Sequence, residues 1–130
     1  MDTTQLKRIP LFANASDEEL KRVAIFAQSR EVDSGTEVVS EGGFSRALMA
    51  IEDGKAEVSR EGEKIADLGP GDIFGEAGML DDDMRSATVT ATSRLKLISL
   101  GHFEVKRLKK DAPGVYKAIE DLVEERKSNQ

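Results

Sequence analysis

The chain has 130 residues and a formal net charge of −6, which suits one acidic globular domain with its own core. This charge argues against contact with nucleic acid or with an anionic membrane, because both partners require a basic face. Cysteine is absent and there is one histidine, which disfavours disulfides, zinc hydrolysis and Ser-His-Asp chemistry. No signal peptide or long apolar run is present. We therefore predict a cytoplasmic protein that holds no metal and is not an enzyme.

Residues 1–30 predict N-terminal helices. Ser16 and Glu19 have the spacing of a capping box, in which each side chain satisfies a free backbone N–H of the first helical turn. An apolar stripe follows at helical spacing, formed by Leu20, Val23, Ala24 and Ala27. Upstream, Pro10 ends a short helical turn.

Between residues 31 and 99 the pattern changes to short segments with alternating β-branched residues, separated by glycines. Many short strands at even spacing predict an antiparallel β-roll of the jelly-roll kind. Residues 75–85 interrupt the alternation with helix formers, which indicates a short helix there. Strands are expected at 36–40, 47–53, 55–60, 64–68, 86–93 and 95–100.

Residues 99–127 predict two C-terminal helices, one over 99–110 and a second that starts after the Asp-Ala-Pro-Gly sequence at 111–114. His102 is expected at the surface, near the start of the first helix. The cations of "KRLKK" are expected to favour the C-terminal end of that helix rather than to bind nucleic acid. The whole chain, 1–130, is therefore predicted to be one α+β domain that is mainly β. The second helix has an apolar side made of Val115, Tyr116, Ile119, Leu122 and Val123.

The segment "FGEAGMLDDDMRSATV", residues 74–89, carries the residues that point to a function. Gly75, Ala77 and Gly78 have little or no side chain, so a ligand can approach their backbone closely. A short helix that begins near Glu76 would direct free N–H groups at an anion.

Around that helix start lie groups suited to a sugar phosphate. Glu76 can accept a hydrogen bond from a hydroxyl, and Arg85 can bind phosphate oxygens through its forked guanidinium. Ser86 and Ala87 add backbone donors and one hydroxyl. These residues form a cradle for a phosphate joined to a sugar, and none of them is suited to break a bond.

The same segment resembles the phosphate-binding cassette of the cyclic nucleotide-binding domain family, whose members include the catabolite activator protein and the regulatory subunits of the cAMP-dependent kinase. The resemblance continues through "IPLFANASDEELKRVA", "EVDSGTEVVSEGGFSRALMAIEDGKAEVS" and "LGPGDIFGE". It implies a β-roll with flanking helices, a short phosphate-binding helix and a last helix that closes over the base.

The resemblance also implies a role for each site residue. Glu76 would bind the ribose 2′-hydroxyl and Arg85 the exocyclic phosphate oxygens. Glu52 stands where an acid could hold the arginine, and Val123 and Arg126 are candidates to cap the base. The full set of ligand-binding residues is Phe74, Gly75, Glu76, Ala77, Gly78, Arg85, Ser86 and Ala87.

These expectations combine into a non-catalytic sensor of a cyclic nucleotide, with cAMP favoured over cGMP. Ligand would move the C-terminal helices, and a separate effector protein would receive the signal from a monomer or weak homodimer. The alternative is an interaction domain of the same fold that binds no cyclic nucleotide, although the presence of both Glu76 and Arg85 counts against it. A metal-dependent enzyme of the β-roll class would need two or three histidines, and a single histidine disfavours it.

Overall fold

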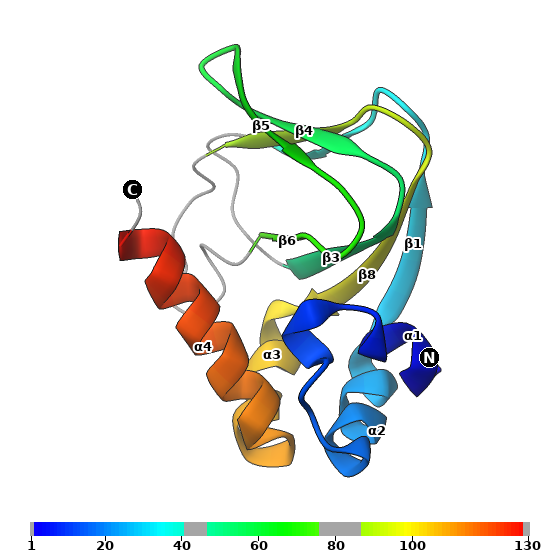
Figure 1. Ribbon diagram of the computed structural model, residues 1–130, viewed down its shortest axis with the longest axis vertical. Helices are drawn as coiled ribbons and strands as arrows, with labels where there is room; N and C mark the ends of the chain where they lie inside the picture. The colour runs from blue at the N-terminus through cyan, green and yellow to red at the C-terminus, as the bar shows by residue number, and fades with distance from the viewer. Residues whose placement is uncertain (1, 41–46, 76–86, 129–130) are drawn as a thin grey trace.

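The computed structural model describes residues 2–40, 47–75 and 87–128, the last three of them by their backbone alone. Helices lie at both ends of the chain and gather at one end of the roll (Figure 1). The N-terminal helices are α1 (Thr3–Lys7), the 3-10 turn η1 (Pro10–Phe12) and α2 (Asp17–Phe26). The C-terminal helices are α3 (His102–Asp111) and α4 (Pro113–Ser128).

The strands between them pair antiparallel in two sheets, with the orders β1-β8-β3-β6 and β2-β7-β4-β5. The predicted mainly β roll is confirmed. The strand bounds are β1 (Gln28–Val32), β2 (Glu37–Val39), β3 (Ala47–Asp53), β4 (Ala56–Arg60), β5 (Glu63–Leu68), β6 (Ile73–Phe74), β7 (Thr88–Ala91) and β8 (Leu95–Gly101).

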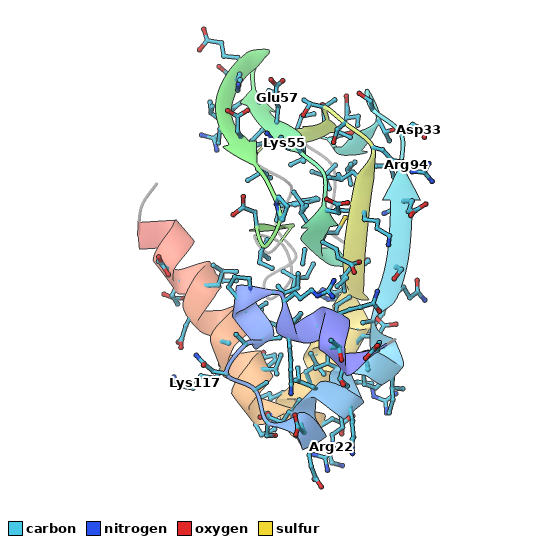
Figure 2. All side chains as sticks on the ribbon, turned by 45° about the vertical axis from the view of Figure 1, so that its right-hand side comes forward. Arg22, Asp33, Lys55, Glu57, Arg94 and Lys117 are labelled. Atoms are coloured by element: carbon cyan, nitrogen blue, oxygen red, sulfur yellow. The ribbon has the colours of Figure 1, made fainter. Side chains whose placement is uncertain are left out.

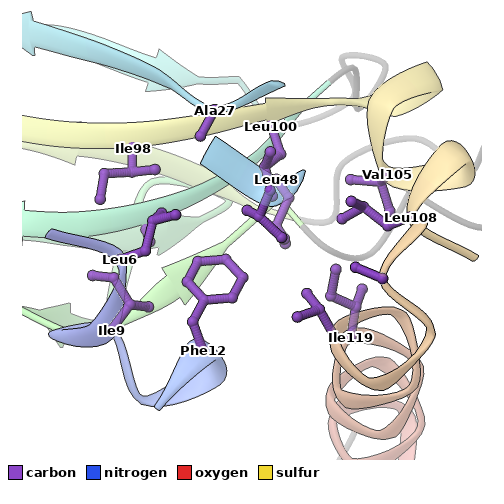
Figure 3. Packing of buried hydrophobic residues seen from close by; sticks show 14 of the residues in the cluster. Leu6, Ile9, Phe12, Ala27, Leu48, Ile98, Leu100, Val105, Leu108 and Ile119 are labelled. Atoms are coloured by element: carbon purple, nitrogen blue, oxygen red, sulfur yellow. The ribbon is translucent and has the colours of Figure 1, made fainter. Parts of the chain in front are cut away.

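The first sheet has apolar side chains on both of its faces. Successive residues of a strand point to opposite faces, so Leu48 and Ala50 of β3 pack against the helices while Met49 and Ile51 pack between the two sheets. Strand β8 divides in the same way. Figure 3 shows the helix-facing cluster, in which Leu48 and Leu100 lie beside Phe12 and the residues of α3 and α4. The first sheet therefore lies between a helical layer and the second sheet.

The turn between β3 and β4 packs against the turn between β7 and β8. Gly54 has a φ of +98°, which favours glycine, and a Cβ placed there would collide with the carbonyl oxygen of Arg94. The Lys55 N–H donates to Ser93 Oγ at 3.0 Å, and the Thr92 N–H donates to the Lys55 carbonyl at 3.0 Å. Glycine at position 54 thus permits the two turns to meet.

Several element boundaries differ from the sequence prediction, and two of the differences lie where a helix meets a strand. Strand β1 begins at Gln28, inside the region 1–30 that was predicted to be helical, because Ala27 adopts an extended conformation that ends α2. Helix α3 begins at His102, since Ser99 and Gly101 belong to β8, where they pair with Met49 and Ala47 of β3.

The prediction that His102 lies at the surface is wrong. Its side chain is only 5% exposed, and its ring meets that of Phe103 edge-on at a centroid distance of 5.5 Å. The side chain enters the buried side of α3 together with Val105 and Leu108, because the three share the spacing of one helix face.

Helix α2 holds the turn between α3 and α4 by its side chains. Ser16 Oγ accepts from the Glu19 N–H at 3.2 Å, which is one half of the predicted capping box. The Glu19 carboxylate instead accepts from the N–H of Gly114 at 2.7 Å and of Val115 at 3.4 Å, at the start of α4. Arg22 donates to the carbonyl of Asp111 at 2.7 Å, at the end of α3. We call Glu19 and Arg22 the α2 clamp.

The charges of the α2 clamp match the helix ends that they touch. An N-terminus exposes unpaired N–H groups and partial positive charge, and a C-terminus exposes carbonyls and partial negative charge. The Glu19 carboxylate contacts the N-terminus of α4, and the Arg22 guanidinium contacts the C-terminus of α3. Gly114 leaves room for this contact, because a Cβ there would lie 2.8 Å from Glu19 Oε2.

Within the described residues, no helix combines the length and the apolarity that crossing a bilayer would require.

Candidate ligand-binding site

The two ends of the predicted cassette are fixed in different sheets. Phe74 ends β6 and pairs with Met49 of β3 in the first sheet, whereas Thr88 begins β7 and pairs with Ser59 of β4 in the second. The chain between them therefore passes from one sheet to the other. Gly75 and Ala87 stand at its two described ends, and residues 76–86 lie outside the described residues.

Phe74 anchors the start of this connection in the core. Its side chain is 5% exposed and belongs to the cluster between the sheets, together with Met49, Ile51 and Leu97. Met49 is equally buried, and the two residues face each other across the β3–β6 pair. A contact between Phe74 and a ligand stays a prediction, and its packing role is the one that the structure describes.

Gly75 turns the chain out of β6 with a φ of +86°. Residues that have a Cβ rarely adopt this backbone conformation, whereas glycine adopts it without steric cost. The cassette therefore begins at a position whose backbone geometry favours glycine.

Gly75→Ala is expected to lower the free energy of unfolding by about 1 to 2 kcal/mol, because alanine must adopt a left-handed φ at this site. Urea unfolding followed by circular dichroism measures the change. Gly69→Ala is the matched control, since a Cβ at position 69 would meet open space and the φ of Gly69 lies outside the left-handed range. Equal stability of the two variants would contradict the assigned role of Gly75.

Glu52 lies at an irregularity of β3. The register between β3 and β8 shifts between Ile51 and Asp53, and such bulges re-aim the side chain of the extra residue. Glu52 Oε1 accepts from Gln5 Nε2 of α1 at 3.1 Å, so the side chain points toward the N-terminal helices. Its other oxygen, Oε2, has no hydrogen bond within the described part of the chain. Sequence reasoning missed Gln5, because the two residues lie far apart in the chain and no local pattern connects them.

The C-terminal base-cap candidates lie in α4. Val123 is 4% exposed and continues the buried side that Val115 and Ile119 begin. Arg126 belongs to the same helix, and only its backbone is described. A groove of about 520 Å³ separates this part of α4 from η1 and from the residues that lead into β6. Its lining includes Leu11, Asp72, Ile73, Leu122 and Glu125.

The remaining predicted site residues, together with the predicted phosphate-binding helix, fall outside the described residues. They are Glu76, Ala77, Gly78, Arg85 and Ser86. The structure provides the frame of the site, a connection between two sheets that begins at a left-handed glycine. Helix α4 lies across the groove from the residues that lead into β6.

Residues 29–111 match the family model of the cyclic nucleotide-binding domain, and this stretch contains the whole cassette. The chain belongs to the cyclic nucleotide-binding domain family. The match confirms the family predicted from the sequence. It also agrees with the expectation of a binding domain rather than an enzyme.

Among sequence relatives, this cyclic nucleotide-binding domain is 39% identical over 105 residues to the cAMP-dependent protein kinase regulatory subunit of Yarrowia lipolytica. The alignment covers 79% of the domain and 28% of the relative, so the chain spans about a quarter of that protein's length.

Solved structures agree on the fold. The domain superposes on cAMP-bound PfPKA-R (141–441) with a TM-score of 0.85 and 25% identity, covering 98% of the domain and 43% of that chain. It superposes on the catabolite activator protein of Thermus thermophilus with a TM-score of 0.83 and 29% identity, covering 92% and 59%. The predicted β-roll with flanking helices is the fold that these neighbours share.

Proposed function

We propose that this domain binds cAMP in the β-roll pocket that the cassette closes. Binding of the ligand would move the C-terminal helices, and this movement would signal to a separate protein. The observation that carries the proposal is the family match over 29–111, which includes Glu76 and Arg85 within an intact cassette. The similarity to a regulatory subunit named for cAMP and to a cAMP-bound structure favours cAMP over cGMP.

In this proposal each cassette residue has one task. Arg85 places its planar guanidinium against the exocyclic phosphate oxygens, where a bidentate, charge-assisted contact is strongest. Glu76 accepts from the ribose 2′-hydroxyl. The backbone N–H groups of Gly75, Ala77, Gly78, Ser86 and Ala87 surround the phosphate, as free donors at a helix start do for other anions.

Residues outside the cassette support these contacts. Glu52 has one oxygen bonded to Gln5, and we propose that the other oxygen accepts from Arg85 and orients it. Val123 or Arg126 would cover the base from α4. Phe74 holds the start of the cassette in the core and would contact the ligand from below.

The proposed response to ligand is a population shift. A ligand changes a conformational equilibrium only by binding one state better than the other. Here the favoured state would be the one in which the cassette grips the phosphate and α4 lies over the base. The groove between α4 and the approach to β6 supplies space for that movement.

Calorimetric titration of the purified chain with cAMP, cGMP and 5′-AMP tests the function. Saturable binding is expected for cAMP, weaker binding for cGMP, and weakest for 5′-AMP, which lacks the ring that joins phosphate to the ribose 3′ oxygen. If neither cyclic nucleotide binds, the proposal is wrong and the alternative interaction domain is favoured.

A further inference from the structure

One face of α3 is a stripe of exposed residues that the core does not use. Phe103, Lys106, Arg107 and Lys110 recur at the spacing i, i+3, i+4 and i+7, which places them on one side of a helix. All four are exposed, and Phe103 retains 72% of its accessible surface. The buried side of α3 is formed instead by His102, Val105 and Leu108.

The end of helix α2 extends this stripe. The Arg107 guanidinium lies 5.0 Å from the centroid of the Phe26 ring, a cation–π contact that joins the two helices at the surface. We define the α2–α3 patch as Phe26, Phe103, Lys106, Arg107 and Lys110.

The charge of the α2–α3 patch is opposite to that of the chain. The sequence carries a net charge of −6, yet the patch contains three cations and no carboxylate. Other exposed cations, such as Lys7, Lys64 and Arg94, form ion pairs. Within the described residues, the structure shows no ion pair for Lys106, Arg107 or Lys110.

The stability of α3 explains only part of this arrangement. Lys110 lies in the last helical turn, where a cation interacts favourably with the helix dipole. That interaction decays within one turn and does not account for an exposed phenylalanine at position 103, in the first turn. Exposed apolar groups that are grouped with polar ones are typical of surfaces that bind a partner.

We propose that the α2–α3 patch binds an acidic segment of a partner protein that also carries an aromatic or aliphatic side chain. Carboxylates of the segment would pair with Lys106, Arg107 and Lys110. Its apolar side chain would cover Phe103, because apolar anchors surrounded by charged groups are the usual pattern of a specific contact.

A protein segment fits better than nucleic acid or a membrane. Both of those are extended anionic surfaces, and they would also face the acidic remainder of the chain, beyond the patch. A short segment contacts the patch alone, and charges more than about 8 Å away are screened at physiological salt. The cyclic nucleotide pocket supplies no residue to this patch, so the inference does not depend on the proposed function.

The test uses a fluorescein-labelled synthetic peptide of glutamate and phenylalanine residues, titrated with the full chain and followed by fluorescence anisotropy. We expect saturable binding that weakens about tenfold in the double variant Lys106→Glu/Arg107→Glu, since two attractive contacts become repulsive. Phe103→Ala should weaken binding about threefold without changing any charge. Circular dichroism of each variant checks that it is folded.

The matched control is Lys55→Glu, which makes the same change of charge on an exposed lysine elsewhere. Figure 2 shows Lys55 at the far end of the roll from Arg22, which marks the helical end. Binding by Lys55→Glu should equal that of the unaltered chain.

The proposal would be overturned by no saturable binding of the peptide, by equal binding of the double variant, or by an equal loss in the Lys55→Glu control. Tighter binding to anionic lipid vesicles or duplex DNA than to the peptide would assign the patch to those partners instead and would also overturn it. A chain that binds the peptide but no cyclic nucleotide would refute only the proposed function.

Discussion

Replacing Arg85 by alanine is expected to weaken cAMP binding by about 30- to 1000-fold, a loss of roughly 2 to 4 kcal/mol. The phosphate carries the only full charge of the ligand, and Arg85 is the only cation between residues 74 and 89. Its removal leaves the anion without a cationic partner in this segment. The cAMP affinity of Arg85→Lys should lie between those of the unaltered chain and Arg85→Ala, because an ammonium keeps the charge but not the bidentate geometry.

Calorimetry with cAMP measures this effect, and Arg94→Ala is the matched control. Arg94 is an exposed arginine that pairs with Glu31 at 2.7 Å in a turn of the roll, and the Arg94 guanidinium lowers the pKa of the Glu31 carboxyl by that hydrogen bond. Its loss should leave cAMP affinity unchanged. Binding by Arg85→Ala that equals the Arg94→Ala control would refute the role of Arg85. Glu76→Gln should weaken binding less, since an amide oxygen still accepts from a hydroxyl.

Glu19→Ala is expected to lower the free energy of unfolding by about 1.5 to 3 kcal/mol, which is typical of a hydrogen bond to a charged group. The carboxylate accepts from two N–H groups at the start of α4, and alanine would leave both without that partner. The favourable charge at the helix N-terminus is lost as well. Urea unfolding followed by circular dichroism measures the change.

Glu18→Ala is the control for this prediction. Glu18 is an exposed acid in the same first turn of α2, so it reports the effect of removing an acid from that turn. Glu19→Gln should be intermediate, because it keeps an acceptor oxygen and loses the charge. If Glu18→Ala and Glu19→Ala unfold at the same urea concentration, the α2 clamp does not stabilise the turn between α3 and α4.

The sequence predicts a strand where apolar and polar residues alternate, or where apolar residues form an unbroken run. Strand β3 was predicted with the bounds 47–53 that the structure shows, because an apolar run between a loop and the turn at Gly54 marks it clearly. Strand β1 was missed. Its residues, "QSREV", are exposed except for a half-buried Val32, so pairing with β8 rather than side-chain burial makes it a strand.

For the candidate site, the sequence reveals only local features. Gly75, Glu76 and Arg85 can be recognised from the sequence, because they lie within one short segment and the chain limits the distance between them. Contacts between distant segments cannot be recognised in this way. Glu52 and Gln5 are separated by 47 positions, and Glu19 and Gly114 by 95, so only the folded chain brings them together. The capping-box motif even suggested a different acceptor role for Glu19.

Because β3 is apolar on both faces, hydrophobicity alone does little to fix its alignment with β8. A shift by one position would exchange the residues of the two faces, and both sets would still be removed from water. The alignment must then depend on the irregularity at Glu52 and on the turn at Gly54, where the backbone of Arg94 leaves no room for a side chain. Two nearby positions at the end of β3 thus favour one alignment of β3 with β8.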